Sequence, residues 1–158
     1  MKRLCGFSDA WRGILRCFRG HNFRIHIAAA VTVLLFAVRY GLERTQYPVL
    51  ILVIAQVLSL EAVNTALETL CDYACRGVRH PKIRIAKDVA AGAVLLSAIG
   101  AVACACFFFS DAEKWHALLS SIQTRDIVVL LCYVLLCAAW ILLPKFDIPP
   151  RNNEKENQ

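Results

Sequence analysis

The chain contains long stretches of apolar residues that carry no charge. Residues 89–109 form one such stretch of 21 residues, and residues 127–143 form another of 17. Stretches of about 17–25 apolar residues match the hydrocarbon thickness of a lipid bilayer. The composition agrees, because 58% of the chain is hydrophobic, whereas a soluble domain averages roughly 45–50%. The sequence therefore predicts a polytopic membrane protein and excludes a water-soluble globular domain.

The distribution of apolar residues predicts an all-α, integral membrane protein with four transmembrane helices. The expected spans are residues 25–40, 48 to about 67, 89–109 and 127–143. The turn between the first two spans is short, so these spans should form an antiparallel hairpin. Residues 149–158 are polar and are expected to be disordered.

A basic amphipathic segment precedes the first span. Its apolar residues recur at helical spacing: they are Leu4, Phe7, Trp11, Ile14, Leu15 and Phe18, and Arg12, Arg16 and Arg19 flank them. A helix of this kind over residues 4–19 lies in the membrane interface. It could serve as an anchor for the first span or as a lid over an active site, and the sequence leaves both open.

The positive charges are distributed unevenly along the chain. Fourteen of the eighteen Lys and Arg residues lie in the N-terminal segment, the 68–88 loop or the C-terminal tail. Because cytoplasmic loops carry the excess of Lys and Arg, both termini and this loop are predicted to be cytoplasmic. Orientation and contact with anionic lipids account for the net charge of +6, so no nucleic-acid partner is expected.

The second span continues into a stripe of polar residues. If one helix runs through the segment, Asn64, Glu68 and Asp72 lie at about 300°, 340° and 20° from Glu61 around its axis. Glu61 lies roughly 20 Å from Pro48 along such a helix, so it is still within the hydrocarbon core. Three carboxylates and one amide thus share one face, and the deepest carboxylate is inside the membrane.

A charged carboxylate at the depth of Glu61 costs at least about 2–3 kcal/mol and is normally functional or neutralised. It could act as a general base, or it could form a buried ion pair between helices. Lys87 and Asp88 begin the third span across the loop from Glu68. This order suggests that a lipid hydroxyl meets Glu61, a divalent metal meets Glu68, and phosphates meet Lys87.

At these residues the chain resembles the prokaryotic diacylglycerol kinases and their undecaprenol kinase relatives, over roughly residues 6–109. The resemblance is carried by the pattern Glu61-x-x-Asn64-x-x-x-Glu68-x-x-x-Asp72, by Ala86-Lys87-Asp88-Val-Ala-Ala-Gly, and by Asn22-Phe-Arg-Ile-His26. The first pattern, inside an apolar helix, is specific. The Lys-Asp pair alone would be weak.

The resemblance implies a homotrimer with an interfacial N-terminal helix and three core spans per subunit, in the bacterial inner membrane. Residues 1–109 would form the lipid kinase domain, and residues 110–158 an extra segment with one further span and a polar tail. The implied reaction transfers the γ-phosphate of ATP, with Mg²⁺, to a membrane lipid hydroxyl at a site facing the cytoplasm.

The resemblance also implies roles for particular residues. Glu61 and Asn64 match the catalytic base and a site-organising amide, and Glu68 matches a metal ligand. The residues that match nucleotide-binding positions are Glu68, Asp72, His80, Lys87 and Asp88. The expected substrate-binding residues are Glu61, Arg24 and Ala91.

Two features depart from the family pattern. A second metal-binding glutamate is common just before the Asn-Phe-Arg-Ile-His stretch, but here the sequence reads Arg19-Gly20-His21, and these side chains are poor ligands for magnesium. Either Glu68 and phosphate oxygens hold the metal, or activity is reduced. The second departure is the fourth span, which has no family counterpart and no function evident from the sequence.

Several functions therefore remain open. Undecaprenol is the first acceptor to consider and diacylglycerol the second, because the stretch Asn22-Phe-Arg-Ile-His26 resembles the undecaprenol kinase branch. A kinase homologue that acts as a membrane scaffold is the main alternative. A proton-coupled transporter subunit that uses Glu61 is another, although four spans without a broken helix or inverted repeat disfavour it.

Overall fold

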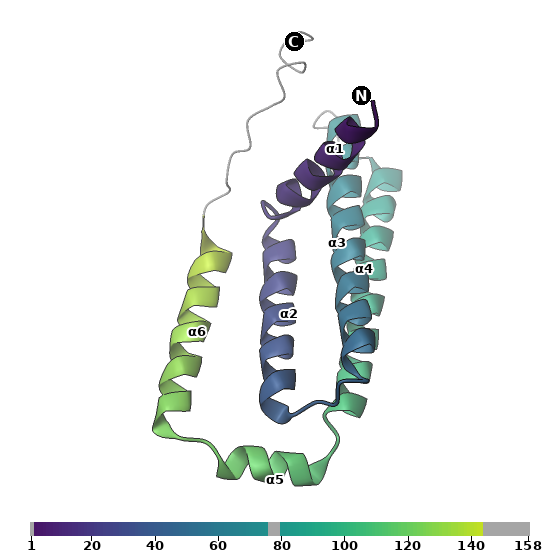
Figure 1. Cartoon of the computed structure of the whole chain (residues 1–158). Coiled ribbons are helices and arrows are strands. Elements are labelled where there is room, and N and C mark those ends of the chain that lie inside the picture. The colour runs from purple at the N-terminus through teal and green to yellow at the C-terminus, as the bar shows by residue number, and fades with distance from the viewer. Residues whose placement is uncertain (1, 76–79, 144–158) are drawn as a thin grey trace.

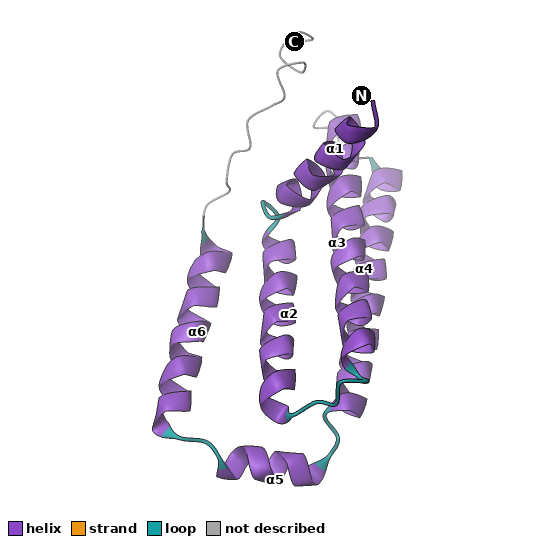
Figure 2. Ribbon diagram, viewed as in Figure 1, coloured by secondary structure: helices purple, strands orange, loops and turns teal. Residues whose placement is uncertain are grey.

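The chain folds into long helices that lie side by side (Figures 1 and 2). The computed structural model describes residues 2–75 and 80–143. Within these residues the helices are α1 (Lys2–Cys17), α2 (His21–Tyr40), α3 (Tyr47–Cys75), α4 (Pro81–Phe108), α5 (Ala112–Ser120) and α6 (Thr124–Leu142). Four of them, α2, α3, α4 and α6, are long and apolar enough to cross a membrane. The predicted all-α fold with four spans is confirmed.

The ends of these helices follow from local sequence. Pro81 is placed in the first turn of α4, where its missing N–H costs nothing, and the side chain of His80 caps that turn by accepting from the Lys82 N–H. At the other end of the molecule, α2 stops at Gly41, which adopts a left-handed φ of 73°. The N–H of Leu42 then bonds back to the carbonyl of Ala37 at 2.9 Å, which closes the helix as a glycine C-cap does.

Helix α3 is longer than a membrane span requires. Its 29 residues correspond to about 44 Å at 1.5 Å per residue, compared with about 30 Å for the hydrocarbon core. The helix continues without a break from Tyr47 through Asp72 to Cys75. The polar end of α3 can therefore project from the membrane while Glu61 stays within it.

Helix α4 packs on α3 more extensively than any other pair of helices in the described part of the chain. Ala90 and Val94 are its buried residues, and small side chains of this kind let helix backbones approach closely. Helix α2 runs antiparallel to α3, as predicted, and α6 flanks α2 on the side away from α3 and α4 (Figure 1). The helix pair α3–α4 thus forms one side of the bundle, and the pair α2–α6 forms the other.

Two helices lie outside this arrangement of spans. Helix α1 runs obliquely across one end of the bundle (Figure 1) and stops at Cys17, two residues earlier than predicted, because Gly20 already caps α2. The sequence analysis missed α5, which joins α4 to α6 at the opposite end. The signals for α5 were Asp111, whose side chain accepts from the N–H groups of Glu113 and Lys114, and the apolar Trp115 and Leu118.

The helix order places α1, the N-terminus of α4 and the C-terminus of α6 at one end, and α5 at the other (Figure 1). At the α5 end, Tyr40 and Trp115 belong to an aromatic cluster with ring centroids 5.6 Å apart, as is common at a membrane interface. The polar tail predicted for residues 149–158 lies outside the described residues, as do five of the fourteen cations assigned to the cytoplasm.

This arrangement yields a topology prediction. A bacterial alkaline phosphatase fused after Gln158 should be inactive, because the end of α6 is expected in the cytoplasm, whereas the same phosphatase fused after Ser120 should be exported and active. Phosphatase activity in whole cells, normalised to fusion protein, measures both. An inactive Ser120 fusion together with an active Gln158 fusion would reverse the orientation.

Candidate active site

The polar stripe of α3 is present as predicted, and its deepest members are buried. Glu61 and Asn64 are each only 3% exposed. One turn further along, the Nδ2 of Asn64 donates a hydrogen bond of 3.0 Å to Oε1 of Glu68, which is half-buried. The other amide atom, Oδ1 of Asn64, is buried, and the described residues offer it no hydrogen-bond partner. An unsatisfied buried oxygen is costly, so this one is available to a bound ligand.

Helix α2 brings a histidine to the buried carboxylate. Nε2 of His26 lies 4.0 Å from Oε2 of Glu61, with side-chain exposures of 24% and 4%. This separation is too long for a direct hydrogen bond, so the two groups are electrostatic neighbours. No role for His26 was predicted from the sequence, where it ends the stretch Asn22-Phe-Arg-Ile-His26. The signal that could have found it is an ionisable side chain within an apolar span, which is rare without a function.

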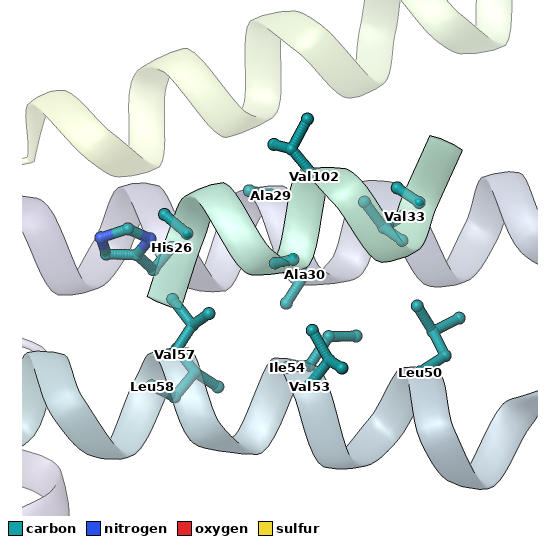
Figure 3. Close-up of a pocket in the computed structure, with 13 residues that line it drawn as sticks. His26, Ala29, Ala30, Val33, Leu50, Val53, Ile54, Val57, Leu58 and Val102 are labelled. Atoms are coloured by element: carbon teal, nitrogen blue, oxygen red, sulfur yellow. The ribbon is translucent and has the colours of Figure 1, made fainter. Parts of the chain in front are cut away.

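An apolar cavity begins at His26 and extends toward the opposite end of the molecule (Figure 3). It has a volume of about 230 Å³ and lies between α2, α3 and α4. Figure 3 shows Val57 and Leu58 on α3 and Ala30 on α2 directed into it, with His26 at one end. Among the described residues that line the cavity, His26 alone has a polar side chain. The cavity therefore connects the membrane interior with the polar stripe.

The turn between α1 and α2 packs against α3 in the same region. Cys17, the last residue of α1, is buried and donates from Sγ to the Gly13 carbonyl. Burial raises the pKa of the Cys17 thiol, and the negative charge of Glu61 raises it further, which disfavours the reactive thiolate form. A Cβ atom placed on Gly20 would lie 3.9 Å from Oγ1 of Thr65. This turn therefore packs against α3 beside the stripe.

A second cluster of charges lies where α3 and α4 leave the membrane core. Nζ of Lys87 donates to Oδ1 of Asp72 at 2.6 Å, and the side chains are 35% and 70% exposed. An ion pair this open to solvent adds little to stability. The pair does hold the ammonium group of Lys87 on the same side of α3 as Glu68, where the solvent can reach it.

The remaining predicted site residues are not joined to these two groups. Asp88 is exposed, and its Oδ2 lies 3.9 Å from Nε of Arg84 on the same helix. His80 is the exposed N-cap residue of α4. Ala91 is exposed. Arg24, by contrast, is buried, and its guanidinium donates to backbone carbonyls of the α1–α2 turn and of the C-terminal end of α6. A role for any of these four in binding stays a prediction.

The stripe offers oxygen atoms, which are the ligands that magnesium prefers. The candidate ligands are the carboxylate of Glu68 and the unpartnered Oδ1 of Asn64. Within residues 2–75 and 80–143 no three His, Cys, Asp or Glu side chains converge to hold a metal alone. A divalent cation here would need further oxygens from water or a substrate, as magnesium commonly does with phosphates. The residues present fit such a cation.

The part of the chain that holds the stripe is similar to known proteins. The sequence model described as "Prokaryotic diacylglycerol kinase" matches residues 8–109. A protein of Synechocystis named diacylglycerol kinase is 44% identical over 100 residues, which cover 63% of this chain and 57% of that protein. A Bacillus subtilis protein named undecaprenol kinase is 38% identical over 94 residues, or 59% of this chain and 76% of the relative. No solved structure matches the chain significantly.

These matches cover only part of this chain and part of each relative. The match to the Synechocystis relative spans just over half of that protein's length. All the matched family residues precede α5 and α6, which begin at Ala112 and Thr124. The family match therefore covers most of α1 and all of α2 to α4, together with the stripe, His26 and the Asp72–Lys87 pair.

The orphan oxygen of Asn64 yields a prediction. Replacing this residue by Leu should leave the protein folded, because it removes a buried polar atom that lacks a partner. It should also weaken the stabilisation by Mg²⁺ with ADP, so that about tenfold more of the cation is needed for the same rise in melting temperature. Gln56→Leu, which changes an exposed amide on the same helix, is the matched control. Equal cation dependence in Asn64→Leu and the control would exclude Asn64 from the site.

Proposed function

Because the chain belongs to the prokaryotic diacylglycerol kinase family, we propose that it transfers the γ-phosphate of ATP to the hydroxyl group of a membrane lipid alcohol. The observation that carries this proposal is the buried carboxylate of Glu61 beside His26, at one end of an apolar cavity. A lipid alcohol whose tail occupies the cavity would present its hydroxyl group to that carboxylate. Phosphates would approach from the solvent, where the Asp72–Lys87 pair lies.

Glu61 is suited to accept the proton of the attacking hydroxyl. In the proposed reaction the lipid oxygen forms a bond to the γ-phosphorus, the bond from that phosphorus to the ADP oxygen breaks, and the hydroxyl proton passes to Glu61. A general base must lie within hydrogen-bond reach of the hydroxyl, directly or through one water, and it is most effective when its pKa lies near the operating pH. When Glu61 takes up this proton, it changes from a charged carboxylate to a neutral acid. His26, whose Nε2 lies 4.0 Å away, would limit the electrostatic cost of that change.

The other side chains hold and orient the donor. Asn64 fixes the carboxylate of Glu68 by its hydrogen bond of 3.0 Å, and these two residues would bind Mg²⁺ through their free oxygens. When bound, the cation neutralises phosphate charge. Lys87, which extends from α4 toward α3, would exchange its partner Asp72 for phosphate oxygens. Asp72, Asp88 and His80 would contact the nucleotide at the solvent-exposed end.

The lining of the cavity favours a polyprenol over diacylglycerol as the acceptor. Diacylglycerol carries ester groups close to its hydroxyl, and such groups lose hydrogen bonds when they enter an apolar site. Among the described lining residues only His26 could donate to them. A polyprenol such as undecaprenol carries only hydrocarbon behind its hydroxyl and fits this lining without loss. Both acceptor classes occur in the names of the relatives.

The proposal includes an assembly and a location. A homotrimer in the bacterial inner membrane, with the site facing the cytoplasm, agrees with the resemblance and with the many apolar side chains that the bundle leaves exposed. Val89, Leu96 and Val102 on α4, for example, are more than 60% exposed. Residues 1–109 would form the kinase domain in this assembly, and residues 110–158 the added segment.

One observation favours the alternative of a scaffold without catalysis. The residues that replace the family's second metal-binding glutamate are Arg19-Gly20-His21, and Gly20 packs beside Thr65 of α3. This turn is therefore close to the stripe and yet supplies no carboxylate. A scaffold would retain the fold and the apolar cavity but would transfer no phosphate.

Replacing Glu61 by Gln separates the catalytic role from a structural one. Glutamine has nearly the same shape but accepts no proton, so the rate of phosphate transfer should fall by about 10²-fold or more. Stability in detergent should hold or rise, because an ionisable group is removed from a buried site. The measurements are the initial rate with γ-labelled ATP and the melting temperature of the same preparation.

The control is Glu43→Gln, which changes an exposed glutamate in the α2–α3 turn at the opposite end; it should alter neither quantity. If Glu61 instead forms a buried ion pair with His26, Glu61→Gln should lower the melting temperature and leave the rate per folded molecule nearly normal. That outcome would contradict the assignment of Glu61 as the base.

A further inference from the structure

Arg24 joins two parts of the chain that are far apart in sequence. Its side chain lies in the first turn of α2 and is buried, with the residue 6% exposed. Nε donates to the carbonyl of Phe18 at 2.7 Å, and Nη1 donates to the carbonyls of Leu143 at 2.5 Å and Trp140 at 3.4 Å. Phe18 belongs to the α1–α2 turn, whereas Trp140 is in the last turn of α6 and Leu143 is its C-cap. One guanidinium therefore bridges this turn and the C-terminal end of the added helix.

The chemistry of a helix end explains why an arginine suits this place. The last four carbonyls of a helix lack intrahelical partners, and the negative end of the helix dipole lies there. Leaving such carbonyls unpaired near lipid is costly. The planar guanidinium presents several donors in a fixed fork, so it can satisfy α6 on one side and the turn on the other.

Two further contacts fasten α6 to α2 and to the turn. The rings of Phe18 and Trp140 lie 6.4 Å apart between centroids. About two turns away along α6, the hydroxyl of Tyr133 is 2.9 Å from Oγ1 of Thr32 and donates to the carbonyl of Ala28 at 3.3 Å. Helix α6 makes its principal contacts with α2 in the described part of the chain. Its attachment is therefore concentrated on α2 and on the turn at its end.

The turn held by Arg24 also positions α1 over the carboxylate site. Cys17, the residue before Phe18, is buried, and α1, which it ends, contacts α3. Gly20, two residues after Phe18, packs beside Thr65 of α3. A displacement of Phe18 would therefore move both contacts that seat the turn on the polar stripe.

We propose that Arg24 is a positioning residue through which α6 fixes the α1–α2 turn, and that the added helix thereby holds α1 over the site. The catalytic nature of that site rests on the function proposed above, whereas the mechanical link through Arg24 does not. In this arrangement α6 supports the α1–α2 turn within the same chain.

Hydrogen exchange of the full-length protein in lipid nanodiscs tests the link without reference to activity. Arg24→Gln should accelerate exchange of backbone amides by on the order of tenfold in two separate segments, residues 14–22 and 136–143. Arg24→Lys should restore part of the protection, since an ammonium still donates to carbonyls. Arg39→Gln is the matched control: this arginine is on the same helix, is exposed, and donates to Ser121 near the start of α6. It should leave both segments unchanged.

A second variant covers the case in which Arg24→Gln does not fold. Trp140→Leu removes the ring contact with Phe18 and leaves Arg24 intact, and it should accelerate exchange in both segments by a smaller factor. If Arg24→Gln affects residues 136–143 alone, Arg24 merely caps α6, and the proposal is wrong. Unchanged exchange in both segments would overturn it as well.

Kinetics distinguish positioning from substrate binding. Arg24→Gln should lower the turnover number by on the order of tenfold with little change in the KM for the lipid alcohol, because a misplaced α1 affects the geometry of the bound complex. A raised KM with unchanged exchange would assign Arg24 to substrate binding and overturn the positioning role. If the wild-type protein transfers no phosphate at all, the proposed function fails, and the exchange data still decide whether the link exists.

Discussion

Glu61 is a carboxylate held inside a bundle of membrane-spanning helices, where its charged form costs at least about 2–3 kcal/mol. Much of the structure at the α1 end surrounds this one group. His26 of α2 lies 4.0 Å away, and Asn64 on the next turn of α3 is equally buried. The α1–α2 turn packs against α3 at Thr65, and an apolar cavity of about 230 Å³ starts at His26. The carboxylate thus lies between an apolar cavity and a solvent-exposed ion pair. This placement suits the proposed transfer of phosphate to a membrane alcohol.

The bundle supports this group from two sides. The close pairing of α3 and α4 brings Lys87 to Asp72 at 2.6 Å and thus places a cation on the solvent side of the stripe. On the other side, α6 lies outside the matched family region and is fastened to α2 and to the turn through Arg24, Trp140 and Tyr133. The added helix is therefore connected with the carboxylate site through the turn, although it contributes no side chain to the stripe.

Sequence patterns predicted the parts of the structure that depend on one helix at a time. Helical pitch alone placed Glu61, Asn64 and Glu68 on one face, and the lengths of the apolar stretches gave all four spans. Contacts between helices were harder, because they depend on rotation and packing that no local pattern specifies. The approach of His26 to Glu61 and the bonds of Arg24 to carbonyls 116 and 119 residues away are of this kind. Helix α5 was missed because nine residues are too few for a clear period.

The most direct test of lipid phosphorylation uses the purified protein in mixed micelles or nanodiscs with Mg²⁺ and γ-labelled ATP. Undecaprenol, a shorter polyprenol and diacylglycerol are offered separately and in competition, and the labelled lipid is separated by chromatography. We expect label in the polyprenols at a higher kcat/KM than in diacylglycerol, since His26 is the only polar side chain among the described residues that line the cavity. Faster labelling of diacylglycerol would contradict the proposed acceptor. Label in no lipid alcohol, from protein that is folded and binds ATP, would contradict the kinase itself and favour the scaffold.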